Sequence, residues 1–224
     1  MKLFINYNHH KTTIIFIHGF RKNHDDFNIT DKGKNILIET TMAKICNTIL
    51  VQIEESDYKK PVADVAEDIY KNIVDIDKTK ITIVAHSHGS FYALSLCETY
   101  PDLFCKLLLI DPTTKSEHYL TKLKMDTEGF NEESVESYKV KYFDMLPTGF
   151  NLKNKIIVRI HLNLQTTQLI DDLNSFLAKI NHLNKLVNKN VKSRLVLHAD
   201  VSHMIHYQIP DVIIDSIKEL HKLL

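Results

Sequence analysis

Unbroken runs of apolar residues recur along this chain, and each one ends at a polar or turn-forming position. Such runs lie at 12–17, 48–53, 81–85 and 106–110. Because apolar and polar side chains do not alternate in them, they are typical of strands buried on both faces, as in a parallel sheet. Two further runs predict strands at 155–160 and 194–197, and residues 3–7 predict an edge strand.

Between these strands, apolar residues recur at steps of three and four, the spacing of an amphipathic helix. The pattern is clearest after Pro61, which opens a helix that continues to about Ile73. Other helices are predicted at 35–46, at 91–97, within 169–187 and after Pro210. Strands that alternate with helices imply an α/β fold, with a mostly parallel central sheet flanked by helices. At 224 residues the chain is expected to form a single domain over residues 1–224.

The charge balance and the length of the apolar runs argue against nucleic acid and membranes as partners. Lys and Arg together number 28, and Asp and Glu also number 28, so the formal net charge is zero. A chain without a basic field is not expected to bind nucleic acid or an acidic membrane surface. No apolar run approaches the length of a membrane span, and the N-terminal apolar stretch is too short and polar for a signal peptide. The three cysteines lack metal-site spacing, and free thiols in a reducing compartment account for them most simply. We therefore expect a cytoplasmic protein without stable membrane insertion.

One predicted strand and the helix after it frame a serine in the sequence Ala85-His86-Ser87-His88-Gly89. A strand that turns sharply into a helix needs small residues two positions before and after the apex, because larger side chains would collide. The apical Ser87 then has an exposed hydroxyl, and the backbone N–H of His88 points to the same space at the helix N-terminus. The pattern matches a G-x-S-x-G nucleophile elbow, with Ala85 in place of the first glycine.

Acyl transfer by a serine also requires a base and an acid that orients the base. The best-placed base is His203, in the loop between the last predicted strand and Pro210, with His206 as the alternative. Ser87 and His203 both follow strand ends, and ligands of parallel sheets bind at the carboxyl ends of the strands. The sequence therefore predicts that these side chains meet at one edge of the sheet.

An oxyanion hole is the remaining requirement. The backbone N–H groups of His88 and Phe20 are the candidates, since His18-Gly19-Phe20 ends a strand where a tight turn can aim an amide inward. His18 itself is expected to support this turn by hydrogen bonding and to take no part in the chemistry.

With the elbow, the turn at His18-Gly19-Phe20 and His203 in this order, the chain resembles the α/β-hydrolase superfamily over nearly its whole length. The stretch from Ala85 to Pro112 is especially similar to the small single-domain serine esterases of that superfamily. The resemblance implies a serine hydrolase of the carboxylesterase, lipase or thioesterase kind. Its substrate would be a small or acyl-chain ester or thioester, cleaved through an acyl-enzyme without a cofactor.

The acid departs from the commonest pattern of the family, which places an aspartate shortly after the penultimate strand. Residues 161–168 contain no carboxylate, and the first ones that follow are Asp171 and Asp172. Asp111 follows the preceding strand in an Asp-Pro setting, a position from which some lipases of the superfamily take their acid. We therefore expect Asp111 to be the acid, with Asp171, Asp172 or a dyad assisted by Asn163 as alternatives.

Residues 113–154 form an insertion at the place where the family carries its cap. The segment is polar and interleaved with aromatic residues, so we expect a short helical cap that covers the pocket above Ser87. The candidates for substrate contact are Tyr119, Tyr142 and Phe143.

Two other functions remain open at this point. The same residues could cleave an amide, a C–C bond or a lysophospholipid, or the protein could be an inactive binding protein with this fold. The pairs His86-x-His88 and His203-x-x-His206 could suggest a metal. Metal hydrolases, however, usually add clustered carboxylates and need no elbow serine, so no metal site is expected.

Overall fold

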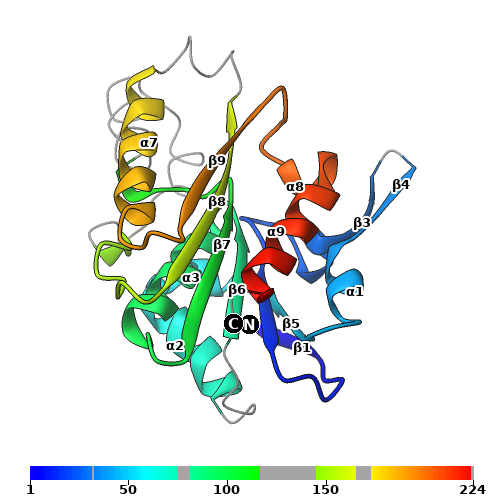
Figure 1. The fold of residues 1–224 in the computed structure, drawn as a ribbon. Coiled ribbons are helices and arrows are strands. Elements are labelled where there is room, and N and C mark those ends of the chain that lie inside the picture. The colour runs from blue at the N-terminus through cyan, green and yellow to red at the C-terminus, as the bar shows by residue number, and fades with distance from the viewer. Residues whose placement is uncertain (32, 75–80, 117–144, 165–172, 223–224) are drawn as a thin grey trace.

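The computed structural model describes the chain except for residues 32, 75–80, 117–144, 165–172 and 223–224. Within the described residues, the central sheet has seven strands in the order β1-β5-β2-β6-β7-β8-β9 (Figure 1). In that order the strands are Lys2–Asn6, Asn47–Gln52, Thr13–Ile17, Ile81–His86, Phe104–Ile110, Ile157–Leu164 and Arg194–Ala199. β1 pairs antiparallel with β5, and the other pairs of this sheet are parallel. The predicted fold class, a mostly parallel sheet flanked by helices, is confirmed.

Helices cover both faces of the sheet, and each face has its own apolar core (Figure 1). One face carries α2 (Val62–Ile73), α3 (Gly89–Thr99) and α7 (Leu173–Val187), and the other carries α1 (Ile38–Met42), α8 (Ile205–Gln208) and α9 (Pro210–Lys222). Along β2, Ile15 and Ile17 belong to the first core, whereas Ile14 and Phe16 belong to the second. The apolar runs of the sequence are unbroken because both faces of the strand are covered.

The predicted helix at 35–46 is wrong in its first part. Residues 34–37 are a strand in a second sheet, and α1 covers only Ile38–Met42. The two strands of this sheet pair antiparallel and are Asn28–Asp31 (β3) and Lys34–Leu37 (β4). Within β4, Ile36 is buried and its neighbours Asn35 and Leu37 are exposed, which is the alternation of a strand with one covered face.

β8 ends later than the sequence predicts, at Leu164. Asn163, which we expected in a loop, therefore lies within the strand, and its side chain is buried. The alternative acids Asp171 and Asp172 lie outside the described residues. So do the three residues proposed to contact the substrate, Tyr119, Tyr142 and Phe143.

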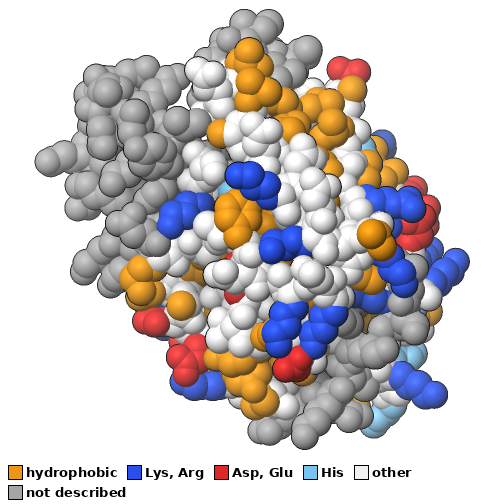
Figure 2. All heavy atoms as spheres, turned by 60° about the vertical axis from the view of Figure 1, so that its left-hand side comes forward, with side chains coloured by type: hydrophobic (Ala, Val, Ile, Leu, Met, Phe, Trp, Pro, Cys, Tyr) orange, Lys and Arg blue, Asp and Glu red, His pale blue; other side chains and the backbone are white. Residues whose placement is uncertain are grey.

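The face of the molecule that carries α7 shows apolar side chains interspersed with side chains of Lys and Arg (Figure 2). On α7 itself, Leu173 and Leu177 are about half exposed. Lys185 places its ammonium group 5.5 Å from the centre of the Phe150 ring, so charge lies directly beside exposed apolar surface. Among the helices that the structure describes, none combines the length and the apolar character that crossing a membrane requires.

Candidate active site

Ser87 stands at the sharp turn between β6 and α3. Its backbone φ is +50°, in the left-handed region that favours glycine, so the turn is strained. Two backbone hydrogen bonds hold it: Ser87 N–H donates to the Ile110 carbonyl at 2.9 Å, and Thr113 N–H donates to the Ser87 carbonyl at 3.2 Å. The serine is thus tied to the chain on both sides of Asp111.

The small residues beside the serine are required by close packing. A Cβ atom on Gly89 would lie 2.6 Å from the carbonyl oxygen of His18 and 2.7 Å from that of Ile17. On the other side of the turn, Ala85 is completely buried. The start of α3 therefore lies directly against the end of β2, which brings the elbow to the turn at Gly19-Phe20.

Gly89→Ala is expected to lower the free energy of unfolding by about 3 kcal/mol, because the two carbonyl groups belong to the backbone and cannot rotate away. Urea denaturation measures this change. The control is Gly33→Ala, where nothing lies within 4 Å of an added Cβ and only a φ of +78° opposes alanine. Gly33→Ala should lower the free energy of unfolding by about 1 kcal/mol. Equal decreases in the two variants would contradict the close packing of Gly89 against the backbone.

His203 and Asp111 form a close pair at the carboxyl edge of the sheet. His203 Nδ1 lies 2.5 Å from Asp111 Oδ2. Asp111 directly follows β7 and is buried, whereas the side chain of His203, between β9 and α8, is 46% exposed. Among the candidate acids that the structure describes, Asp111 is thus the one that contacts His203.

The Asp111 carboxylate also forms an ion pair with a lysine. Lys179, on α7, places Nζ 3.2 Å from Asp111 Oδ1. Burial raises the pKa of Asp111, but the charge of Lys179 and the hydrogen bond with His203 outweigh it and hold the pKa below its ordinary value. The carboxylate is therefore ionised at neutral pH, so it can orient the imidazole and stabilise an imidazolium.

The residue before the serine contacts the loop of His203. The ring centres of His86 and His203 are 4.8 Å apart, and His86 Nε2 lies 3.3 Å from the His203 carbonyl oxygen. Ser87 and His203 are both described, and no hydrogen bond joins the Ser87 hydroxyl to the His203 ring in this structure. Catalytic hydrogen bonds are often long without a substrate and tighten when one is bound.

The turn after β2 is held by His18. Its Nδ1 donates to the Gly19 carbonyl at 2.7 Å, and its Nε2 accepts from the Ile53 N–H at 2.9 Å. Burial lowers the pKa of His18, which favours the neutral ring that this pair of bonds requires. The imidazole thus supports the turn by hydrogen bonding, in the way the sequence suggested.

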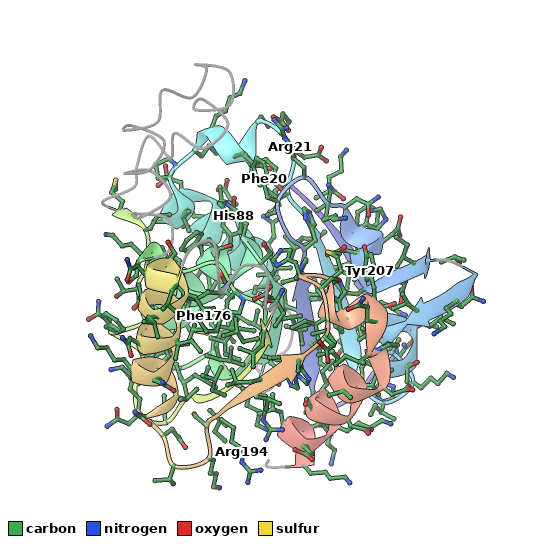
Figure 3. All side chains as sticks on the ribbon, turned by 90° about the horizontal axis from the view of Figure 1, so that it is seen from above. Phe20, Arg21, His88, Phe176, Arg194 and Tyr207 are labelled. Atoms are coloured by element: carbon green, nitrogen blue, oxygen red, sulfur yellow. The ribbon has the colours of Figure 1, made fainter. Side chains whose placement is uncertain are left out.

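Phe20 and His88, the candidates for the oxyanion hole, lie next to each other (Figure 3). Their ring centres are 5.6 Å apart, and Tyr58 contacts both, with ring centres 4.7 Å from Phe20 and 5.9 Å from His88. Within the described part of the chain, the N–H of Phe20 has no hydrogen-bond acceptor. Burial raises the pKa of Tyr58 to about 12, so its hydroxyl stays neutral. Tyr58 was not predicted as a site residue, because the polar stretch around it carries no motif; the structure places it in the short 3-10 helix Asp57–Lys59.

Solved structures share this arrangement of strands and helices. One is an α/β-hydrolase enzyme from a sediment metagenome of the lagoon of Mar Chica, Morocco, with a TM-score of 0.64 and 14% identity over 94% of this chain and 90% of that chain. The chain has the α/β-hydrolase fold. A structure from a study of carboxylesterases of Nitrososphaera gargenis has a TM-score of 0.66 and 10% identity, over 99% and 94% of the two chains. An enol-lactonase from Burkholderia xenovorans LB400 has a TM-score of 0.65 and 10% identity, over 99% and 96%.

These matches confirm the predicted α/β-hydrolase fold. No protein-family model and no curated protein sequence matches the chain. At identities of 10–14% the likeness establishes the fold and not the reaction, which depends on the residues of the site. In the α/β-hydrolase fold of this chain, Ser87 follows β6, Asp111 follows β7 and His203 follows β9.

Within the described residues, His206, the alternative base, has no hydrogen bond or ion pair with Asp111 and belongs to a second cluster. It is completely buried on α8, with Nε2 3.6 Å from Asp26 Oδ2. Asp26 Oδ2 also lies 3.2 Å from His86 Nδ1, and Asp26 Oδ1 accepts a 2.6 Å hydrogen bond from the Tyr207 hydroxyl. Burial raises the pKa of Asp26, but the facing imidazoles hold that pKa below its ordinary value. For His86, burial lowers the pKa to about 4.

Lys179→Met is expected to destabilise the protein by about 3–5 kcal/mol at pH 7, because it leaves a buried carboxylate without its cation. Without the lysine, the pKa of Asp111 in the folded state should rise above its unfolded value. The variant then gains stability as the pH falls toward 4, so its deficit against the wild type should shrink. Urea denaturation between pH 4 and 7 measures both effects.

The control for this variant is Lys71→Met, which removes an exposed ion pair with Glu67 on α2. It should leave the free energy of unfolding almost unchanged at every pH. A deficit of Lys179→Met that stayed constant from pH 7 to pH 4 would contradict the assignment of Lys179 to Asp111.

Proposed function

We propose that the protein is a serine hydrolase that cleaves carboxylic esters or thioesters of small or acyl-chain substrates. The observation that carries the proposal is the 2.5 Å contact of His203 Nδ1 with the buried Asp111, at the same edge of the sheet as the strained Ser87. An imidazole bound to a carboxylate through Nδ1 has Nε2 available as a base. The fold neighbours, which include an enol-lactonase and a structure from a study of carboxylesterases, agree with ester chemistry.

In the proposed reaction, Ser87 Oγ attacks the substrate carbonyl carbon while His203 Nε2 takes the hydroxyl proton. The carbonyl oxygen becomes an oxyanion that accepts hydrogen bonds from the N–H groups of Phe20 and His88. The tetrahedral intermediate then expels the alcohol or thiol, which receives the proton from His203. An acyl group remains on Ser87, and Asp111 stabilises the imidazolium whenever it forms.

A water molecule completes the cycle. His203 takes a proton from the water, whose oxygen attacks the acyl carbon. When the second tetrahedral intermediate collapses, the carboxylic acid leaves and the proton returns to Ser87 Oγ. The enzyme is restored, and no cofactor or redox partner is consumed.

The described side chains beside the elbow favour an apolar acyl group. Phe20, Tyr58 and His88 form an aromatic group, and the Arg21 guanidinium carbon lies 5.2 Å from the centre of the Phe20 ring. Rings of this kind present apolar area to a substrate, while the polar tips of Tyr58 and His88 can hydrogen-bond to it. We propose that this group forms one wall of the substrate pocket.

Stopped-flow hydrolysis of p-nitrophenyl esters with acyl chains of two to twelve carbons, together with one acyl thioester, tests the proposal. An acyl-enzyme predicts a burst of p-nitrophenol equal to the enzyme concentration whenever deacylation is the slower step. Turnover should be above the buffer rate for at least one chain length. If no substrate in the series were turned over above that rate, the ester-hydrolase proposal would be wrong and a binding role for the fold would be favoured.

A further inference from the structure

Asp26, His86 and His206 form a compact buried cluster beside the elbow. They come from three separate segments: Asp26 from the short 3-10 helix His24–Phe27 after β2, His86 from the end of β6, and His206 from α8. All three side chains are at most 2% exposed. One donor atom from each lies within 4.8 Å of the other two. A carboxylate and two imidazoles in this arrangement are the donors of a metal site.

We propose that Asp26 Oδ2, His86 Nδ1 and His206 Nε2 bind one divalent transition-metal ion, zinc by preference, which fastens the loop of His203 to the nucleophile elbow. Two nitrogen ligands and one carboxylate oxygen form a donor set that suits zinc and its first-row neighbours better than calcium or magnesium. The ion would stabilise the site and would not activate the substrate.

The two distances from Asp26 Oδ2 to the histidine nitrogens agree with a shared ion. Asp26 Oδ2 lies 3.2 Å from His86 Nδ1 and 3.6 Å from His206 Nε2. Two ligand atoms on one tetrahedral zinc ion, each bound at its usual length, lie about 3.4 Å apart. Both separations are close to that value, and the two histidine nitrogens lie within 4.8 Å of each other. The contact of His206 with Asp26 is longer than a hydrogen bond, so a hydrogen bond does not account for it.

His206 supplies an independent reason for a ligand. It is completely buried, and neither of its ring nitrogens has a hydrogen-bond partner among the described residues. Burying an imidazole in this way without a partner costs free energy, because water would have satisfied both nitrogens. An ion bound to Nε2 would satisfy the nitrogen that faces Asp26.

The surroundings of the cluster resemble the outer contacts of known metal sites. The Tyr207 hydroxyl donates to Asp26 Oδ1, which leaves Oδ2 to face the two imidazoles. Figure 3 shows Tyr207 at the C-terminal helices, to the right of and below Phe20 and His88. His86 Nε2 lies 3.3 Å from the His203 carbonyl oxygen, and metal-bound histidines commonly donate their second N–H to a backbone carbonyl.

The tautomer of His86 adds to this argument. If a neutral His86 carries its proton on Nε2 for the His203 carbonyl, then its Nδ1 lone pair faces the Asp26 carboxylate at 3.2 Å. If it carries the proton on Nδ1, then Nε2 faces the carbonyl with a lone pair. One neutral ring cannot satisfy both neighbours, whereas a cation on Nδ1 and a proton on Nε2 satisfy both.

Metal analysis of the purified protein tests the proposal without reference to catalysis. The wild type is stripped with EDTA, incubated with two equivalents of zinc, desalted, and analysed by mass spectrometry of the metal. We expect about one zinc per chain in the wild type and less than a tenth of that in Asp26→Asn and in His206→Gln. The control is His182→Gln, another buried histidine, on α7, that hydrogen-bonds Ser116 and the Thr148 carbonyl and should keep its zinc.

Two measurements on the wild type decide the matter even if a variant fails to fold. Free zinc at 100 times its dissociation constant should raise the thermal midpoint by about 5–10 °C over the EDTA-treated protein. Cobalt in place of zinc should give the intense visible absorption bands of a four-coordinate ion. A wild type that retains no metal and has the same midpoint with zinc and with EDTA would overturn the proposal. Zinc retained equally by the wild type and by folded Asp26→Asn and His206→Gln would overturn it as well.

Discussion

Ser87→Ala is expected to reduce kcat/KM for ester hydrolysis by about 10⁴-fold or more, because alanine has no oxygen to form the acyl-enzyme. The residual rate would come from the oxyanion hole and from substrate binding alone. The loss should appear in kcat, since the serine hydroxyl contributes little to ground-state binding. Steady-state kinetics on the best substrate of the p-nitrophenyl series measures it.

The matched control is Ser90→Ala, three residues further along in α3. Ser90 is buried, and its hydroxyl donates to the Thr113 carbonyl at 3.0 Å, so its loss affects the same turn without removing the nucleophile. We expect a modest loss of stability, about 1 kcal/mol, and nearly unchanged kcat. If Ser90→Ala lowered kcat as strongly as Ser87→Ala, the effect would be due to disruption of the elbow and not to the nucleophile.

Asp111→Asn is expected to lower kcat by about 10³- to 10⁴-fold. An asparagine amide in this place favours the wrong tautomer of His203 and cannot stabilise its cation. The same substitution leaves Lys179 without its carboxylate, so the thermal midpoint has to be measured beside the kinetics. Assay temperatures well below that midpoint separate the loss of catalysis from the loss of fold.

The two alternative acids provide the comparison for this variant. Asp171→Asn and Asp172→Asn should leave kcat nearly unchanged if Asp111 orients His203. A larger loss in either of them than in Asp111→Asn would move the acid to that position. Small losses in all three variants would favour a dyad of Ser87 and His203.

The central sheet could be predicted because its strands are buried on both faces. Ile14 to Ile17 have to be apolar without exception, since each face of β2 packs on its own core. The order of elements and the strand ends at Ser87, Asp111 and His203 followed from these runs. An amphipathic stripe such as that of α2 is equally visible in a sequence, because its spacing repeats over three turns.

Short elements carry too little of a pattern to be assigned in this way. Ile36 and Ile38 fit a strand, while Ile38 and Met42 fit a helix, and all three are buried. Gly33, with a φ of +78°, forms the turn that lets β4 return along β3. Over so few residues the spacing of apolar side chains could not distinguish a strand from a helix, so the sequence did not predict the β3–β4 hairpin.

Contacts between distant segments are the other part that sequence could not supply. Lys179 and Asp111 are 68 positions apart, and nothing near Lys179 marks it as the partner of a buried acid. For the pairs His86-x-His88 and His203-x-x-His206 the sequence predicted no metal site, because no carboxylates cluster beside them. The structure groups one histidine of each pair, His86 and His206, around Asp26, which lies in a polar stretch 60 positions before His86.

Labelling with a fluorophosphonate probe, followed by peptide mapping, tests the central claim most directly, because the probe reacts only with a serine whose proton is removed by a base. We expect one probe per chain, attached to Ser87, at a rate that His203→Ala lowers strongly. A folded protein that takes up no probe, or takes it up at another residue, would contradict the assignment of Ser87 as the nucleophile.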